Sequence, residues 1–215
     1  RMRTQNLELP EGVDVTFRNI VMKYDQGSNT EAKDATTGNI TSYNMTFVGN
    51  GGTLTFEEGV KFLKHNDEAM HPVVYGGTKA AKAAGSTSVI KIRGDYQFSA
   101  IYNYDELRIR GNVKTEELDA QNDDGSHKGA TAEQKGYKGE TLIAKGKTLT
   151  LLNKENEAEK SIRKIGSLRG LDEVPKDSTE VGELKIARPR TEPVSNPENE
   201  EVLKLTSEDP LRYDT

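Results

Sequence analysis

The chain of 215 residues consists largely of short runs in which apolar and polar residues alternate, and most of these runs end at a Gly or an Asn. No helix-length apolar stripe separates one run from the next. Successive side chains of a strand point to opposite faces, so the alternation predicts short strands with one buried face. The runs are Val13–Phe17, Ile20–Tyr24, Asn44–Val48, Thr53–Phe56, Val89–Ile92, Glu106–Arg110 and Thr148–Leu151.

Repetition of one small unit is typical of chains whose neighbouring units bury each other's faces. The hydrophobic fraction is 33% and the charged fraction 30%, which leaves little material for a thick core. A solenoid needs only a narrow stack of side chains in each turn of the chain. We therefore expect an all-β fold, a β-solenoid with long loop insertions. A β-sandwich is the alternative, because it too has many short strands separated by turns.

The chain divides into a body and a tail by composition. Residues 1–187 form the predicted solenoid body, and polar, Gly-containing stretches near 25–39 and 115–138 are predicted to be loop insertions. Residues 188–215 are rich in Pro and Glu, with one apolar island at Val202–Leu205. Such a composition buries too little apolar surface to fold alone. We expect a linker or an extended tail that packs on the body at most near this island.

Charge and composition also narrow the classes of function. The net charge is −5, with acids and bases interspersed, which argues against a nucleic-acid partner. Without Cys the chain has no disulfide, thiolate metal site or catalytic Cys. No run approaches the roughly 18 apolar residues of a membrane span, and no signal peptide is visible. The chain starts at Arg1 rather than Met, so the sequence leaves open whether a targeting segment precedes it.

Four stretches carry a resemblance to a known family: VDVTFRNIVMKYD, ITSYNMTFVGNGGTLTFEEGVKF, SVIKIRGDYQFSAIYNYDELRIRGNV, and GYKGETLIAKGKTLTLLN followed by IGSLRGLDEV. Together they resemble the right-handed parallel β-helix, or pectate-lyase-like, regions of Gram-positive cell-wall-anchored surface proteins. The resemblance spans most of residues 12–186. It implies a right-handed β-helix in an adhesin held outside the bacterial cell.

An aromatic stretch supplies the best candidate binding residues. Tyr and Phe side chains recur at even positions from 96 to 104, which places them on one face of an uninterrupted strand. Tyr side chains beside Asp and Arg suit a sugar or a protein partner. The alternative is that these Tyr residues stack in the coil interior or against a loop. The candidate ligand-binding residues are Asp95, Tyr96, Tyr102, Tyr104, Asp105, Arg108 and Arg110. The tripeptide Arg93–Asp95 spells an integrin-type motif but fits a turn.

One acidic cluster is a candidate metal site. Asp119, Asp123 and Asp124 could supply the hard oxygen ligands that Ca²⁺ prefers, with His127 nearby. Asp-Asp-Gly is equally ordinary turn chemistry, so a solvated loop is the other interpretation. We expect no cofactor, with Ca²⁺ as the single alternative, and no catalytic residue is assigned.

The favoured function is therefore a non-catalytic binding or structural segment of an extracellular bacterial adhesin, which recognises a host glycan or protein through an exposed lateral face. One alternative is a polysaccharide lyase or hydrolase on the same fold. Such an enzyme needs converging acids and a base in one groove. The other alternative is a viral tail or fibre protein, which needs apolar seams between chains.

Overall fold

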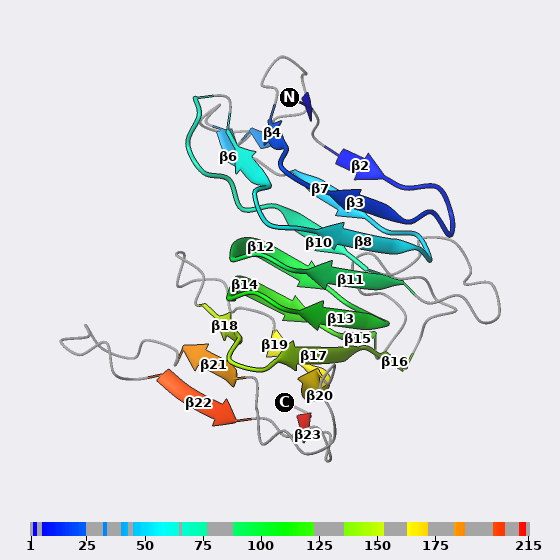
Figure 1. Cartoon of the computed structure of the whole chain (residues 1–215), viewed down its shortest axis with the longest axis vertical. Helices are drawn as coiled ribbons and strands as arrows, with labels where there is room; N and C mark the ends of the chain where they lie inside the picture. Colours follow the sequence, from blue (N-terminus) through cyan, green and yellow to red (C-terminus); the bar gives the residue numbers. More distant parts are fainter. Residues whose placement is uncertain are drawn as a thin grey trace.

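A computed structural model describes residues 2–3, 6–24, 32–33, 40–42, 45–64, 66–76, 88–122, 136–152, 163–171, 183–187, 200–204 and 211–213. Every secondary-structure element in this part of the chain is a β-strand. Most pair in parallel, in ladders that lie together in one elongated stack (Figure 1). The predicted all-β class with parallel pairing is confirmed. The β-sandwich alternative is wrong, because the sheets of a sandwich are antiparallel.

Three ladders run along the stack. The first pairs β2 (Asn6–Glu8), β7 (Thr46–Val48), β10 (Val73–Tyr75), the later residues of β12 (Tyr96–Tyr102) and β14 (Val113–Asp119), and β19 (Arg163–Lys164). The second pairs β3 (Val15–Phe17), β8 (Thr53–Phe56), β11 (Val89–Ile92), β13 (Glu106–Ile109), β17 (Glu140–Ala144) and β20 (Gly166–Leu171). The third ladder has two parts: β1 (Met2–Arg3), β4 (Val21–Lys23) and β9 (Lys61–Leu63), and then the early residues of β12 and β14 with β18 (Thr148–Leu151) and β21 (Glu183–Ala187).

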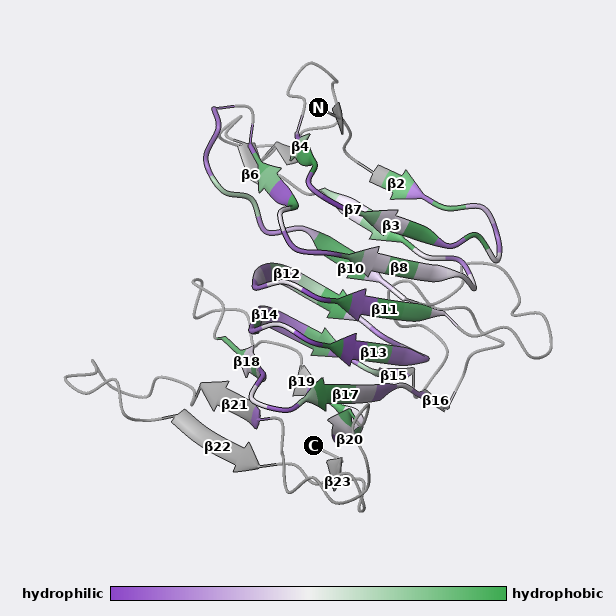
Figure 2. Ribbon diagram, viewed as in Figure 1, coloured by the Kyte–Doolittle hydropathy of each residue, from purple (hydrophilic) through white to green (hydrophobic). Residues whose placement is uncertain are grey.

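The chain visits the ladders in a fixed order. It passes through β2, β3 and β4, then β7, β8 and β9, and then β10, β11 and β12. In the shortest repeat, Asp95 and Asn112 are 17 residues apart and are joined by a hydrogen bond. Green and purple residues share the same short strands in Figure 2, for example on β11 and β13. This alternation lets each strand bury one face in the stack.

Glycine corners let one repeat lie directly on the next. A Cβ atom on Gly111 would lie 1.9 Å from the carbonyl oxygen of Gly94, so the backbones of these two corners touch. Beside them, the Asp95 carboxylate accepts a hydrogen bond of 2.7 Å from the backbone N–H of Asn112. Thus the Gly and Asp of the Arg93–Asp95 tripeptide form and stabilise the turn between β11 and β12.

All five Phe residues of the chain meet in one part of the core. Phe56 packs against each of the other four Phe rings. Its ring centroid lies 5.2 Å from that of Phe47 and 5.9 Å from that of Phe98. From β13 onward the core consists of Leu, Ile and Val side chains such as Leu107, Ile109 and Leu168. Concentrating the few aromatic rings in one place gives a narrow stack a well-packed centre.

The predicted insertion near 115–138 is partly wrong. Residues 113–119 form β14, and Gln121–Asn122 (β15) pairs antiparallel with Tyr137–Lys138 (β16). The charged sequence hides this strand, because Glu117 and Asp119 are buried on its outer face while Leu118 enters the core. In the insertion near 25–39, Ala32–Lys33 (β5) pairs antiparallel with Ile40–Ser42 (β6). Residues 25–31, 34–39 and 123–135 of the two insertions lie outside the described residues.

The predicted tail contributes two strands at the C-terminal end of the stack. Glu200–Lys204 (β22) pairs antiparallel with β21, and Leu211–Tyr213 (β23) pairs antiparallel with β20 (Figure 1). Val202 and Leu203 of the apolar island thus lie on a strand that ends one ladder. An antiparallel strand at the end of a parallel ladder occupies an edge that would otherwise be open to another chain.

The near-copy of Thr53–Phe56 at Thr148–Leu151 forms a strand with the same burial pattern, but in another ladder: β8 belongs to the second and β18 to the third. The likeness therefore reflects a shared strand pattern rather than equivalent positions in the repeat. Within the described residues, no helix has the length and apolar character of a membrane span.

Candidate functional site: a cationic groove on the second ladder

Two hollows adjoin on the outer face of the second ladder, at the corner where its strands end. The smaller has a volume of about 110 Å³ and is lined by four basic side chains. The larger, of about 490 Å³, also contains acidic and amide groups. They share Arg93 and Arg110, and we call the combined depression the cationic groove. Its lining residues are Arg18, Asn19, Glu57, Glu58, Lys91, Arg93, Arg108 and Arg110.

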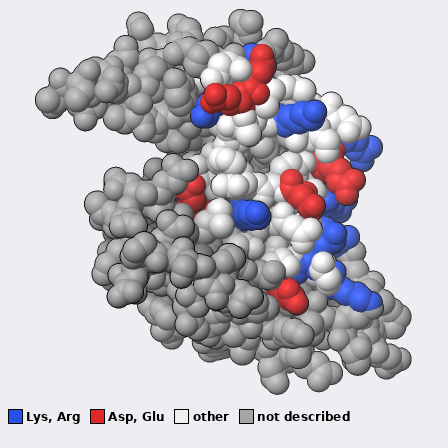
Figure 3. Space-filling view, turned by 90° about the vertical axis from the view of Figure 1, so that its left-hand side faces the viewer, with Lys and Arg blue, Asp and Glu red and all other residues white. Residues whose placement is uncertain are grey.

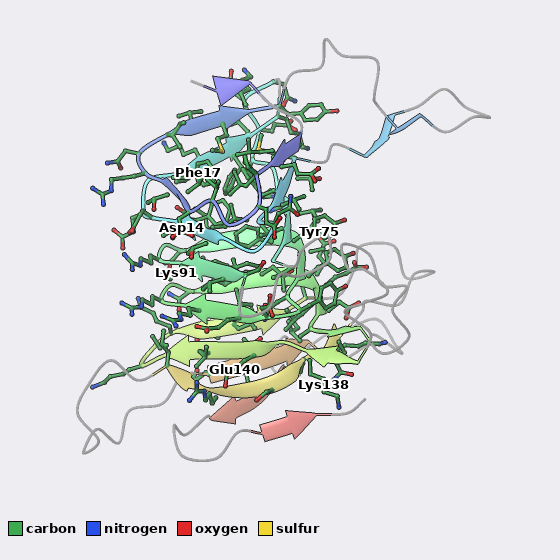
Figure 4. All side chains as sticks on the ribbon, turned by 90° about the vertical axis from the view of Figure 1, so that its right-hand side faces the viewer. Asp14, Phe17, Tyr75, Lys91, Lys138 and Glu140 are labelled. Atoms are coloured by element: carbon green, nitrogen blue, oxygen red, sulfur yellow. The ribbon has the colours of Figure 1, made fainter. Side chains whose placement is uncertain are left out.

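The parallel register brings the basic side chains together. Lys91 of β11 pairs directly with Arg108 of β13. The backbone N–H of Arg110 donates to the carbonyl of Ile92, which places Arg110 beside Arg93 at the corner. Neighbouring strands are about 4.8 Å apart, so side chains in register lie within reach of one ligand. Lys and Arg side chains gather along the right-hand edge of the described surface in Figure 3, and Lys91 projects from the left of the stack in Figure 4.

Two carboxylates offset part of this charge. The Arg93 guanidinium forms an ion pair of 2.8 Å with Glu57, and Arg108 forms an ion pair with Glu106 of the same strand. The ammonium group of Lys91 has no ion-pair partner among the described residues. Like charges directly opposite each other on neighbouring strands destabilise a sheet. The Lys91–Arg108 pair is therefore a cost that the fold carries.

The Arg110 guanidinium shows the same crowding. Partial burial lowers its pKa below the ordinary value, and the positive charges of Arg93 and Arg108 lower the pKa further. Glu57 acts in the opposite direction. An anion in the groove would relieve this repulsion, because it supplies the opposite charge at short range.

Of the basic groove residues, Arg108 and Arg110 are among the candidates from the sequence, whereas Arg18, Lys91 and Arg93 are not. A signal was present: Lys91-Ile92-Arg93-Gly94 and Arg108-Ile109-Arg110-Gly111 share a basic-apolar-basic-Gly pattern. The Ile residues enter the core, and the basic residues on either side face outward. With parallel pairing in register, this repeated pattern specifies a two-by-two cluster of cations.

The predicted aromatic face is not one exposed surface. Phe98 points into the main core, whereas Tyr102 and Tyr104 belong to a separate cluster on the outer face of the first ladder. Tyr102 is 5% exposed and Tyr104 is 1% exposed. The periodicity breaks at Ser99, because β12 leaves the third ladder there and enters the first. Tyr102 and Tyr104 are therefore buried, but on the outer face of the first ladder and not in the core between the ladders.

This outer aromatic cluster consists of Val48, Val73, Tyr75, Ala100, Tyr102 and Tyr104. The rings of Tyr75 and Tyr102 are stacked 4.8 Å apart with an interplanar angle of 9°. The Tyr102 hydroxyl donates a hydrogen bond of 2.8 Å to the buried carboxylate of Glu117. Tyr75 lies on the side of the stack opposite Lys91 in Figure 4. The cluster is therefore a packed structural face, remote from the cationic groove.

The remaining candidate ligand residues serve the corners of the stack. Asp105 accepts a hydrogen bond of 2.9 Å from the backbone N–H of Ser88, as Asp95 does from Asn112. This bond with Asn112 lowers the pKa of Asp95. Tyr96 is half-buried against Phe62, and its hydroxyl donates to the carbonyl of Glu57. Tyr96 thus supports the backbone of a groove residue.

The candidate metal site is only partly in view. Asp119 is buried, and its carboxylate accepts the backbone N–H of Gln121 at 3.1 Å. Asp123, Asp124 and His127 lie outside the described residues. In the part of the chain that the structure describes, no three His, Asp or Glu side chains gather as a metal site would require.

The cationic groove therefore combines an exposed location, residues from successive repeats and an excess of positive charge. Such an arrangement binds anions through charge-assisted hydrogen bonds. No protein-family model matches the chain, and neither a curated protein sequence nor a solved structure is significantly similar to it.

Proposed function

We propose that this chain is a non-catalytic binding segment of an extracellular bacterial surface protein, an adhesin whose cationic groove docks a host glycan or protein. The observation that carries the proposal is the set of five basic and two acidic residues that line the groove, with Glu106 as a third carboxylate beside Arg108. This excess of positive charge favours the binding of an anionic ligand. Acid–base chemistry instead needs a proton donor and acceptor placed at one bond.

The proposed architecture is a closed, right-handed parallel β-helix. Parallel ladders that the chain visits in a fixed order support it, as does the short repeat of 17 residues between Asp95 and Asn112. The resemblance to Gram-positive cell-wall-anchored proteins supports the proposed location at the cell surface. A ligand that lies along the stack would contact several repeats at once.

The rigidity of the groove supports a binding role. Four of its basic side chains start from β11, β13 and the corners that follow them, where backbone hydrogen bonds join each strand to its neighbours. The fifth, Arg18, directly follows β3. Sites on strands hold their side chains more precisely than sites on loops. Ion pairs with Glu57 and Glu106 further restrict the guanidinium groups of Arg93 and Arg108.

An array of immobilised glycans and host proteins tests the proposal. We first identify the array ligand that the unaltered chain binds. The double variant Lys91→Gln/Arg108→Gln should bind this ligand much more weakly, because it removes two cations from the groove. Lys138→Gln is the matched control, since Lys138 is exposed and lies on the far side of the stack in Figure 4. Equal binding by the double variant and the unaltered chain would contradict a role for the groove.

The same preparation should be offered acidic polysaccharides with and without a calcium chelator. We expect no turnover in either condition. Cleavage that the chelator abolishes would replace the adhesin proposal with a Ca²⁺-dependent lyase.

A further inference from the structure

We infer that the cationic groove recognises a tetrahedral oxyanion, the sulfate or phosphate ester of a glycan, in its smaller hollow. This inference rests on the proposed binding function and names the chemistry of the group that is bound.

The donors around the smaller hollow approach from two directions. Lys91 and Arg108 extend from the outer face of neighbouring strands, whereas Arg93 and Arg110 extend from the corner. One guanidinium fork already satisfies the two oxygens of a carboxylate. An ester of sulfate or phosphate presents three free oxygens that point in different directions, so it can accept from both sets of donors at once.

Charge favours the same group. All four side chains that line the smaller hollow are basic, and the Lys91 ammonium has no carboxylate partner in the described part of the chain. Glu57 and Glu106 offset the charges of Arg93 and Arg108. A single oxyanion would place negative charge between Lys91 and Arg108, where the register otherwise opposes two like charges.

The two hollows differ in size and polarity, and this difference favours a glycan. The smaller hollow, of about 110 Å³, accommodates a small group, and the adjoining one, of about 490 Å³, has room for a sugar ring. Asn19 and Glu58 line the larger hollow and can exchange hydrogen bonds with hydroxyl groups. A second phosphate placed there would meet the Glu58 carboxylate.

The whole-chain charge points away from a nucleic acid. The net charge is −5, so a long polyanion is repelled by the chain as a whole while the groove attracts it locally. A glycan that carries an isolated ester beside neutral hydroxyl groups matches both the basic hollow and its polar neighbour. Duplex DNA does not, because it carries phosphates at regular short intervals.

Isothermal titration calorimetry tests this inference with an oligosaccharide that carries one sulfate ester beside neutral hydroxyl groups, and with its desulfated form. We expect the unaltered chain to bind the sulfated form at least about tenfold more tightly, since charge-assisted hydrogen bonds carry the difference. Arg110→Gln should reduce this preference to about twofold or less, and Lys91→Gln should weaken it without disturbing the corner. Lys138→Gln is the control and should leave the preference intact.

Competition with sodium sulfate and sodium phosphate then distinguishes the two esters, and stronger competition by either supports the inference. Equal affinity for the sulfated and desulfated forms overturns it, as does tighter binding of a short DNA duplex. If a ligand is still retained on the array in those cases, the proposed function stands without this inference. If the array retains no ligand at all, the proposed function itself fails.

Discussion

The outer faces of the first and second ladders are built by the same parallel register and have opposite chemistry. On the first ladder, in-register residues Val48, Tyr75 and Tyr102 stack into a buried cluster. On the second, the register pairs Lys91 with Arg108 and leaves the cations at the surface. A parallel ladder therefore stacks in-register residues on one another. The chemistry of these residues decides whether the stacking stabilises the fold.

The energetic contrast separates scaffold from candidate site. Stacked aromatic rings contribute about 0.5–1.5 kcal/mol beyond the area they bury, and the Tyr75–Tyr102 pair has this geometry. Opposed like charges on a sheet surface act in the other direction, and their effect is smaller because solvent screens exposed charges. Local features that oppose folding without an evident compensating gain are expected at functional sites. The cationic groove is such a feature, whereas the outer aromatic cluster is not.

The largest expected effect is the loss of the Tyr102 ring. Tyr102→Ala removes a buried side chain from the outer aromatic cluster and should lower the free energy of unfolding by about 3–5 kcal/mol. Urea denaturation measures this change. Tyr102→Phe keeps the ring and removes only the hydrogen bond to Glu117, so it should cost about 1–3 kcal/mol. An unchanged denaturation midpoint for Tyr102→Ala would show that this face does not stabilise the fold.

Alkaline pH should also act on the aromatic face. Burial raises the pKa of Tyr102 and Tyr104 above the ordinary value of 10.0, and the carboxylates of Glu117 and Asp119 raise the respective pKa values further. The unfolded chain therefore releases these protons at lower pH than the folded chain. Their contribution to stability is complete below pH 10 and declines above it, by about 1.4 kcal/mol per pH unit for each Tyr.

Urea denaturation between about pH 9 and about pH 11.5 measures this slope. Tyr102→Phe is the internal control, since it removes one of the two titrating hydroxyls and should make the slope about 1.4 kcal/mol per pH unit shallower. Identical slopes for the two proteins would contradict the buried, protonated state of Tyr102.

The smallest expected effect on stability belongs to the cationic groove. Lys91→Gln removes one of two opposed cations and should change the free energy of unfolding by no more than about 0.5 kcal/mol, with a gain as the expected direction. Thermal unfolding at low ionic strength measures it, because salt screens surface charges. A loss of more than about 2 kcal/mol would mean that Lys91 is structural and would remove the contrast between the faces.

The sequence predicts strands well where apolar and polar residues alternate over a whole run, as in Val89–Ile92 and Glu106–Arg110. It fails at Tyr96–Tyr104, because the chain changes ladder at Ser99 without a Gly or Pro to mark the bend. It also conceals β14, where buried carboxylates stand in place of apolar residues. Local periodicity shows which residues alternate along a strand, but it does not show which strands lie next to that strand in the fold.

The candidate site was partly predictable for a related reason. Arg108 and Arg110 are candidates from the sequence because they flank the aromatic stretch, whereas Lys91 and Arg93 join them only through the parallel register between β11 and β13. Pairing between strands is a long-range property. Without it, the chain shows interspersed charge and no patch.

If ligand binds on the second ladder while the outer face of the first ladder is scaffold, only the second ladder should respond to ligand. A single NMR titration measures this, with the side-chain N–H signals of arginine and the ring signals of tyrosine followed as the singly sulfated oligosaccharide is added. We expect the signals of Arg93, Arg108 and Arg110 to shift and those of Tyr75 and Tyr102 to stay unchanged. Shifts at Tyr75 and Tyr102 with the three arginine signals unmoved would contradict this assignment.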